Sequence, residues 1–177
     1  MQKSSTNMNR LEQTKDLSPT LYSEEFQQTY HSIHGAISES NHVFIQHGLV
    51  EIAKIKNDIS IFEMGYGTGL NAALTWKYAL ENELDIRYLS IEKFPVERSI
   101  HDSFLTQDGD LNHLLIQLNQ AEWGLLNSLE RIQFQKIQDD LTGFILNQDF
   151  DLIYYDAFSP NAQPELWTED IFRKMVL

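Results

Sequence analysis

The sequence predicts an α/β fold built on a mostly parallel sheet, and three observations support this prediction. Four short strand-like runs are separated by segments with helical periodicity. All but the third of these runs are mostly apolar, as expected for strands that are covered on both faces. The first run leads directly into a glycine-rich turn and a helix. Because strands that alternate with helices form parallel βαβ units with right-handed crossovers, we expect a doubly wound sheet.

Composition narrows the class of protein. The chain has 177 residues, 42% of them hydrophobic, which is enough for one core and favours a single domain. It contains no cysteine, so disulfides and thiolate zinc sites are excluded. Its apolar runs are shorter than the roughly 18 to 20 residues of a membrane span, and its first residues lack the apolar segment of a secretory signal. We therefore expect a cytoplasmic protein with no membrane association.

The net charge bears on nucleic-acid binding. The chain has 26 acidic and 13 basic residues, a formal net charge of −13. An extended nucleic-acid groove needs clustered Lys and Arg, so this balance argues against a large surface of that kind. A strongly acidic balance more commonly keeps a small enzyme soluble.

The amino-terminal third lacks a strong pattern. Residues 1–18 are polar and without apolar periodicity, so they are predicted to form a mobile tail. Residues 19–48 mix aromatics, histidines and turn formers, and they are predicted to form a cap segment over the core of a single domain spanning residues 19–177. Residues 49–56 carry apolar side chains at helical spacing and predict a helix that leads into the first strand.

The remaining elements follow in alternation. Helices are predicted between the first two strands, between the second and third, and after the fourth, where Thr168 is suited to be the N-cap. The predicted strands are 59–64, 86–92, 131–137 and 150–156, and the predicted helices are 69–83, 110–120 and 168–177. A doubly wound sheet normally continues beyond this point. We therefore expect a sheet truncated after the fourth strand, which a missing segment or a partner would complete.

The glycine-rich turn is the sharpest local signal. Gly65, Gly67 and Gly69 alternate between the first strand and its helix, where glycine lets a ligand approach the backbone beside the N–H groups of the helix start. A dinucleotide fold would have glycine in place of Leu70, which disfavours a nicotinamide oxidoreductase. With Glu63, the pattern Glu-x-Gly-x-Gly-x-Gly resembles the first motif of Rossmann-like methyltransferases. Their donor, S-adenosylmethionine, has an ammonium group that an acid near the glycines would help to hold.

Two further acidic positions suit a nucleoside. Glu92 closes the second strand roughly twenty residues beyond the turn, where a carboxylate can accept hydrogen bonds from both ribose hydroxyls. Asp140 follows the third strand and would accept from the adenine amino group, with Asp139 as the less favoured neighbour. In the alternative interpretation, both aspartates only solvate a turn.

The segment after the fourth strand suits the methyl acceptor. Asp156 ends that strand, and substrate sites in open α/β sheets lie beyond the carboxyl ends of strands. A carboxylate there can orient an amine and accept its proton, while aromatic walls such as Phe158 hold a flat base and exclude water. Alternatively, Asp156 caps the next helix and the aromatic rings belong to the core.

Three motifs together carry a family resemblance. GYGTGLN (65–71), IEKFP (91–95) and YYDAFSPNAQPELWT (154–168) follow one another as in the methyltransferase half of the MnmC family and its stand-alone counterpart MnmD. The resemblance runs from about Leu21 to the end of the chain. It implies a Rossmann-like fold and transfer of a methyl group from S-adenosylmethionine to 5-aminomethyl-2-thiouridine at the wobble position of transfer RNA, the expected partner. The FAD-dependent oxidase half of the bifunctional members has no counterpart here.

The resemblance also assigns residues. It implies Asp156 as the catalytic, substrate-facing carboxylate, cofactor contacts from the glycine turn and its acidic partners, and substrate contacts beyond the fourth strand. The cofactor residues are Glu63, Gly65, Gly67, Thr68, Gly69, Glu92 and Asp140, and the substrate residues are Phe158 and Pro160. The segment also suggests Tyr22 and His31 on the substrate side. No metal is expected, because the spacing of His31, His34, His42 and His47 matches no ligand motif.

Two alternatives remain open. The same cofactor half would serve a methyltransferase with another acceptor. A truncated chain would instead be a non-catalytic fragment that acts as a binding module.

Overall fold

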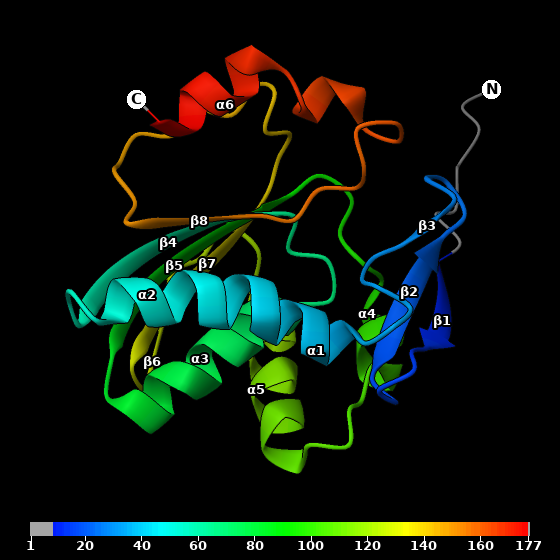
Figure 1. Cartoon of the computed structure of the whole chain (residues 1–177), viewed down its shortest axis with the longest axis horizontal. Coiled ribbons are helices and arrows are strands. Elements are labelled where there is room, and N and C mark those ends of the chain that lie inside the picture. Colours follow the sequence, from blue (N-terminus) through cyan, green and yellow to red (C-terminus); the bar gives the residue numbers. More distant parts are fainter. Residues whose placement is uncertain (1–8, 177) are drawn as a thin grey trace.

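The fold is organised around one five-stranded sheet. The computed structural model describes residues 9–176. The strand order is β6-β7-β5-β4-β8, with β7, β5, β4 and β8 parallel and β6 antiparallel to β7 (Figure 1). The strands are β4 Asp58–Met64, β5 Asp85–Glu92, β6 Asn127–Leu129, β7 Ile132–Gln138 and β8 Leu152–Tyr155. The predicted parallel α/β sheet is confirmed, and each of the four predicted strands is present with both ends within two residues of the prediction.

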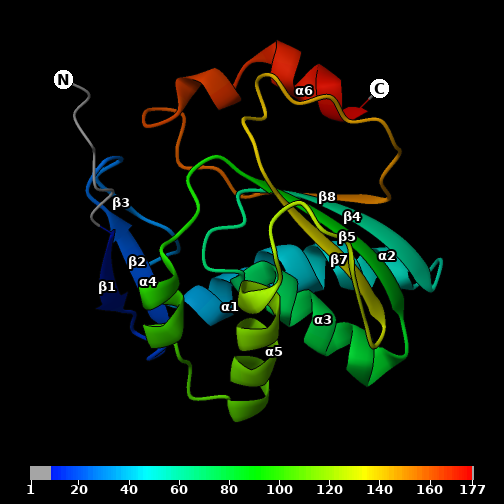
Figure 2. The same cartoon turned by 180° about the vertical axis from the view of Figure 1, so that it is seen from behind.

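Helices cover both faces of the sheet. The helices α1, α2, α3 and α5 lie on one face and α6 lies on the other, as the two opposite views show (Figures 1 and 2). The helices are α1 Ala36–Ser40, α2 Val50–Ala53, α3 Leu70–Asn82, α4 Arg98–Ser103, α5 Gly109–Gln120 and α6 Glu169–Val176, with a π-helical segment η1 Asn41–Leu49 and a 3-10 turn η2 Pro164–Leu166. The predicted helices α3, α5 and α6 are confirmed, and the Thr168 Oγ1 atom accepts a hydrogen bond from the Ile171 N–H (3.4 Å) at the start of α6.

The core has two layers because strand side chains alternate between faces. In β4, Ile59 and Ile61 pack with α3 and α5 on one face, whereas Phe62 and Met64 pack with α6 on the other. Burial on both faces explains why this strand is an almost continuous apolar run.

The amino-terminal segment differs from the prediction. Residues 9–18 are not a tail: β1 (Asn9–Gln13) pairs antiparallel with β2 (Pro19–Ser23), which pairs with β3 (Gln28–Thr29) in a separate sheet. The prediction for residues 1–8 lies outside the described residues. The strand β1 was missed because it has little apolar alternation of its own and is held by backbone pairing with β2.

The helix predicted over residues 49–56 also begins earlier. A continuous helical run extends from Ala36 to Ala53 through α1, η1 and α2. A π-helical turn is wider than an α-helical turn, so the buried Ile45 and Leu49 do not continue an α-helical apolar pattern from α1. This widening made the segment appear irregular in sequence. Among the described residues, no helix combines the length and apolar character needed to cross a bilayer.

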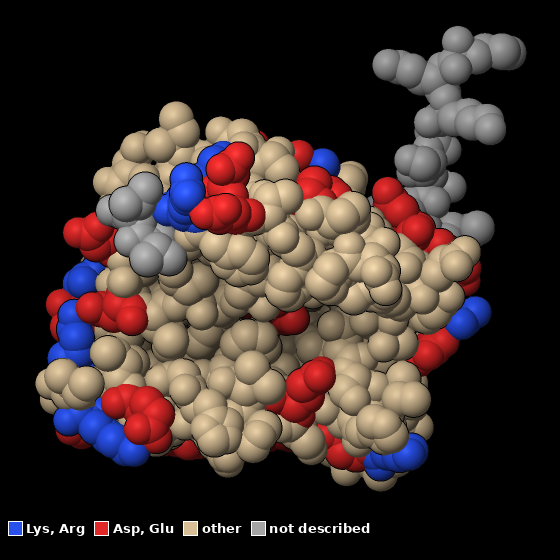
Figure 3. All heavy atoms as spheres, turned by 45° about the horizontal axis from the view of Figure 1, so that its top comes forward, with Lys and Arg blue, Asp and Glu red and all other residues tan. Residues whose placement is uncertain are grey.

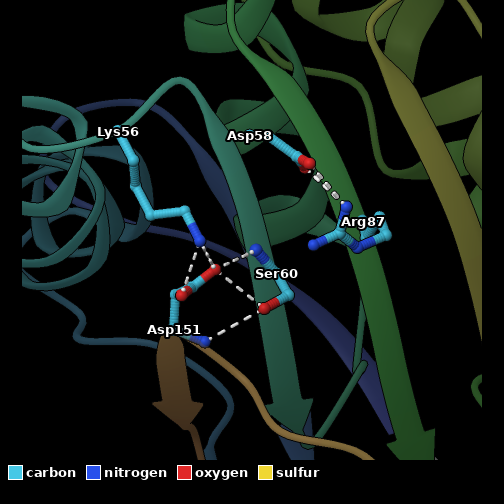
Figure 4. Close-up of polar contacts among 5 residues, drawn as sticks. All are labelled: Lys56, Asp58, Ser60, Arg87 and Asp151. Carbon is cyan, nitrogen blue, oxygen red and sulfur yellow. Dashed lines mark hydrogen bonds and ion pairs between the residues drawn. The ribbon is translucent and has the colours of Figure 1, made fainter.

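A polar cluster fastens the edge strand β8 to β4 (Figure 4). Asp151 precedes β8, and its carboxylate accepts hydrogen bonds from the Ser60 N–H and Oγ–H, both at 2.8 Å. Lys56 Nζ lies 2.8 Å from the same carboxylate. Although burial opposes it, hydrogen bonding from Lys56 and Ser60 lowers the pKa of Asp151 to about 2. These contacts define where β8 starts on β4.

We expect Asp151→Asn to lower the free energy of unfolding at neutral pH by about 1–3 kcal/mol, because it removes the charge from several hydrogen bonds. Because folding lowers the pKa of Asp151, its carboxylate stabilises the protein fully above the unfolded-state pKa near 4. This stabilisation is lost as the pH falls through about 2. The matched control is Asp58→Asn, which breaks the ion pair between Asp58 and Arg87 that is also drawn in Figure 4. The Asp58 side chain is 62% exposed and the Arg87 side chain 52%. That pair should contribute less than about 1 kcal/mol. Equal losses in urea denaturation of the two variants would contradict this account.

Candidate active site

A cavity that is open to solvent lies at the carboxyl ends of the parallel strands. Its walls come from the loops after β4, β5, β7 and β8 and from the segment around β3. Small-molecule sites of open α/β sheets occur at this end of the strands. The predicted residues that border it are Gly65, Gly67, Thr68, Glu92, Asp140, Asp156 and Phe158.

The glycine turn after β4 forms the base of the cavity. Gly65 has a φ of 92°, and its N–H donates to the Ile91 carbonyl at 3.0 Å, which ties the turn to β5. A Cβ atom on Gly65 would lie 2.3 Å from the Asp156 carbonyl oxygen, so only glycine allows the turn and the end of β8 to approach this closely. Gly69 is the N-cap residue of α3 and does not border the cavity. It therefore shapes the turn rather than a ligand surface.

The end of α5 supports the glycine turn from behind. The Tyr66 hydroxyl donates to Asn119 Oδ1 (2.7 Å), and Asn119 Nδ2 donates to the Thr68 carbonyl (3.2 Å). Lys136 Nζ in turn donates to the Asn119 carbonyl (3.1 Å), and burial lowers the pKa of Lys136 to about 8. The side chain of Asn119 thus holds both sides of the turn. Sequence reasoning missed this residue because it lies far from the motif in the chain.

Glu92 links β5 to the glycine turn. Its Oε2 atom accepts from the Gly67 N–H at 3.1 Å, and its Oε1 atom accepts from the Phe94 N–H at 2.8 Å. Burial raises the pKa of Glu92 even though these backbone hydrogen bonds oppose the shift. Because it also borders the cavity, this carboxylate is available to a polar ligand.

Glu63 lies beneath the turn rather than on the cavity surface. Its side chain is fully buried (0% exposed) and does not line the cavity. One oxygen accepts from Ser90 Oγ at 2.7 Å, and the other, Oε1, is buried without a hydrogen-bond partner among the described residues. Burial raises the pKa of Glu63 to about 8, so the carboxyl is largely protonated at neutral pH.

Asp156 directly follows β8, borders the cavity and is suited to proton transfer. Its Oδ2 atom accepts from Asn71 Nδ2 at 2.8 Å, and its N–H donates to the Met64 carbonyl at 2.9 Å. Burial raises the pKa of Asp156 to about 7; the hydrogen bond from Asn71 opposes the shift, and the charges of Glu39 and Glu92 add to it. A group that is part protonated at neutral pH can serve as a proton acceptor or donor.

Asp139 and Asp140 both border the cavity. Asp140 also organises its own turn, because its Oδ1 atom accepts from the Thr142 N–H at 2.9 Å. Its Oδ2 atom lies 2.7 Å from Lys93 Nζ, and although burial opposes it, this pairing lowers the pKa of Asp140. Asp140 can therefore hold its own turn and also contact a ligand in the cavity.

The loop after β8 contributes one predicted wall but not the other. Phe158 borders the cavity, whereas Pro160 is exposed and lies outside it. The chain turns away after Phe158, because the Ala162 N–H and Gln163 N–H both donate to the Ser159 carbonyl. This turn carries Pro160 away from the cavity.

Several cavity residues were not assigned from the sequence. They include Phe26, Tyr30, Asn71, Lys93, Phe94 and Gln163. The last four lie within the three motifs quoted above, whereas Phe26 and Tyr30 lie outside them and had no local signal. His31 borders the cavity, and burial lowers its pKa to about 4, whereas Tyr22 lies beneath Arg10 and outside the cavity. Within residues 9–176, no cluster of three or more His, Cys, Asp or Glu side chains is arranged to hold a metal.

Comparisons with known proteins agree with this geometry. A family profile described as S-adenosyl-L-methionine-dependent methyltransferase matches residues 116–177. The chain is 28% identical over 167 residues to "tRNA 5-methylaminomethyl-2-thiouridine biosynthesis bifunctional protein MnmC" of Marinomonas sp. (strain MWYL1), covering 86% of this chain and 25% of the relative. The protein of the same name in Cupriavidus metallidurans is 30% identical over 175 residues, covering 87% and 25%.

A solved structure, MNMC2 from Aquifex aeolicus, matches with a TM-score of 0.81 and 25% identity, over 98% of this chain and 58% of that one. The chain spans about a quarter of the length of the curated relatives it matches. These comparisons confirm the predicted Rossmann-like methyltransferase fold and the resemblance to the methyltransferase half of MnmC.

Proposed function

We propose that this chain, which matches the methyltransferase half of MnmC, transfers a methyl group from S-adenosylmethionine to the primary amine of 5-aminomethyl-2-thiouridine at the wobble position of transfer RNA. One observation carries the proposal: Asp156, whose pKa is about 7, borders the same cavity as the glycine turn and Glu92. Groups suited to a nucleoside and a group suited to take a proton therefore line the same cavity.

The polar groups of the cavity fit the proposed donor. The Thr68 Oγ1 and Asn71 Oδ1 atoms are buried without a hydrogen-bond partner among the described residues, although both residues border the cavity. Buried polar atoms without partners are costly, so a polar ligand at this position would satisfy them. We propose that Glu92 accepts from the ribose hydroxyls and Asp140 from the adenine amino group. Glu63 lies behind the turn and off the cavity surface, so it would not contact the ammonium group of the donor.

The chemistry requires little from the protein beyond placement and proton transfer. S-adenosylmethionine supplies an electrophilic methyl group that needs no further activation. In the proposed reaction, the amine nitrogen forms a bond to the methyl carbon while the sulfur–carbon bond breaks, and S-adenosylhomocysteine leaves. Asp156 accepts the proton that the nitrogen loses. Phe158 and the neighbouring rings exclude water and hold the flat base.

The surface charge makes the choice of acceptor the main point to test. On the face drawn in Figure 3, basic side chains lie near the rim beside acidic ones, and acidic side chains lie nearer the centre. This face therefore does not form a broad basic groove for RNA.

The proposed function is tested by transfer of a radiolabelled methyl group to transfer RNA that lacks only the final methylation. Label at the wobble base is the expected result. Label on another acceptor would retain methyl transfer but exclude the proposed substrate. If calorimetry detects no binding of S-adenosylmethionine or S-adenosylhomocysteine at millimolar concentration, the proposed function is wrong as a whole.

The pH dependence of the reaction should report on Asp156. Only the carboxylate can accept a proton, so kcat/KM should rise as the pH increases through about 7 and level off above it. Loss of the proton from the substrate amine acts in the same direction. The measurement is a pH profile of methyl transfer at saturating donor, compared with that of Asp156→Asn. An inflection near pH 7 that persists in the variant would show that it belongs to another group.

A further inference from the structure

The amino-terminal sheet reaches into the cavity through two aromatic rings. Phe26, in the turn between β2 and β3, stacks on Phe158 with ring centroids 4.6 Å apart. Tyr30, just after β3, meets Phe158 edge-on at 5.1 Å. A Cβ atom on Gly67 would lie 3.1 Å from Tyr30 Cδ1, so the Tyr30 ring also lies against the glycine turn. Both rings are half-buried and border the cavity.

A pair of hydrogen bonds joins this sheet to the loop after β8. Gln28 Nε2 donates to Ser159 Oγ at 2.6 Å, and the Ser159 N–H donates to Gln28 Oε1 at 3.2 Å. Ser159 directly follows Phe158, so the two bonds fix the backbone that carries this ring. The residues are 131 positions apart in the chain. A single side chain of β3 therefore sets the position of the wall beside Asp156.

We propose that the segment Phe26–Tyr30, here called the hairpin wall, is part of the acceptor site and selects for a flat aromatic ring next to the reacting amine. Phe26 is the residue that stacks with the acceptor base, and Gln28 is a positioning residue that acts through Phe158. This inference rests on the proposed function and deepens it, because it names the feature of the acceptor that the site recognises.

The location of the rings supports contact with the methyl acceptor rather than with the methyl donor. Phe26 stacks on the ring two residues after Asp156, the proposed proton acceptor. Phe26 lies farther from Phe94, with ring centroids 6.1 Å apart. Phe94 follows Glu92, on the side of the cavity proposed for the ribose. Aromatic side chains that meet nucleobases stack with any base and give sequence-tolerant binding. The hairpin wall therefore suits recognition of a base rather than of a sequence.

The test compares Phe26→Ala with Phe172→Ala, a matched loss of a phenyl ring on α6, where Phe172 is 40% exposed and lies outside the cavity. We expect Phe26→Ala to lower kcat/KM for undermethylated transfer RNA about tenfold, the size of one lost base stack. The dissociation constant of S-adenosylhomocysteine should change less than about twofold. Phe172→Ala should leave both quantities unchanged.

A second pair of variants tests the positioning role of Gln28. Gln28→Ala removes both contacts with Ser159 and should lower kcat/KM for transfer RNA about as much as Phe26→Ala, again with little effect on donor binding. In Gln28→Glu the carboxylate accepts from both the Ser159 N–H and the Ser159 hydroxyl, so this variant should restore most of the activity. If Gln28 had only a structural role, its replacement would impair kcat/KM for transfer RNA and donor binding alike.

The outcomes separate this inference from the proposed function. If the wild-type protein binds donor and methylates transfer RNA but Phe26→Ala does the same at full rate, the inference alone is wrong. It is also wrong if Phe26→Ala or Gln28→Ala weakens donor binding as much as it weakens kcat/KM. If the wild-type protein transfers no methyl group to transfer RNA, the proposed function is wrong and the inference is wrong with it.

Discussion

Replacing Asp156 with asparagine should lower the turnover of methyl transfer about 10²–10⁴-fold, the usual effect of removing a positioned proton acceptor. Asparagine keeps the shape of the side chain, and its Oδ1 atom can still accept from Asn71 Nδ2, which lies 2.8 Å from the native carboxylate. The variant cannot take a proton from the amine. Its affinity for S-adenosylmethionine should therefore change much less than its turnover.

Single-turnover kinetics and calorimetry on the same preparation separate these two effects. Asp149→Asn is a suitable control, because Asp149 is exposed and lies outside the cavity. Asp156→Ala should also depress turnover more than donor affinity. Proportional losses of turnover and affinity would make Asp156 a structural residue that holds the end of β8.

Replacing Gly65 with alanine should abolish measurable donor binding and lower the free energy of unfolding by about 3 kcal/mol. The added Cβ atom would lie 2.3 Å from the Asp156 carbonyl oxygen, a backbone atom that cannot rotate away. In addition, a φ of 92° is a conformation that residues with a side chain rarely adopt. The glycine turn and the end of β8 would have to separate, and the cavity lies between them.

The matched control is Gly109→Ala at the start of α5. An added Cβ atom there meets no atom within 4 Å, and the backbone is not in the left-handed region. This variant should unfold in urea at the same concentration as the wild type or slightly above it. If Gly65→Ala retained donor binding of wild-type strength, the glycine turn would not be the donor site.

Part of the site could be predicted from local sequence patterns alone. The glycine turn needs only a strand, a run of alternate glycines and a helix, all within one continuous segment. The position of Glu63 was also predictable, although the family resemblance implies direct cofactor contact. Strand side chains alternate between faces, so Glu63 shares the face of the buried Ile59 and Ile61 and points into the core.

Other residues of the site had no local signal. Asn119 supports the glycine turn from the end of α5, and Gln28 joins the loop after β8 across 131 positions. The raised pKa of Asp156 depends on burial by segments that are distant in the chain. Such contacts follow from how the elements pack, which the pattern within one element does not specify.

By itself, the sequence determined the order of strands and helices in the parallel sheet, the glycine turn and the acidic ends of the strands, because each depends on periodicity or backbone preference within a few residues. The tertiary structure alone decided that the segment around β3 forms a wall of the cavity and that Pro160 lies outside it. The physical reason is that burial and hydrogen bonding between distant segments are properties of the packed chain, and they set both the shape of the site and the protonation of its carboxylates.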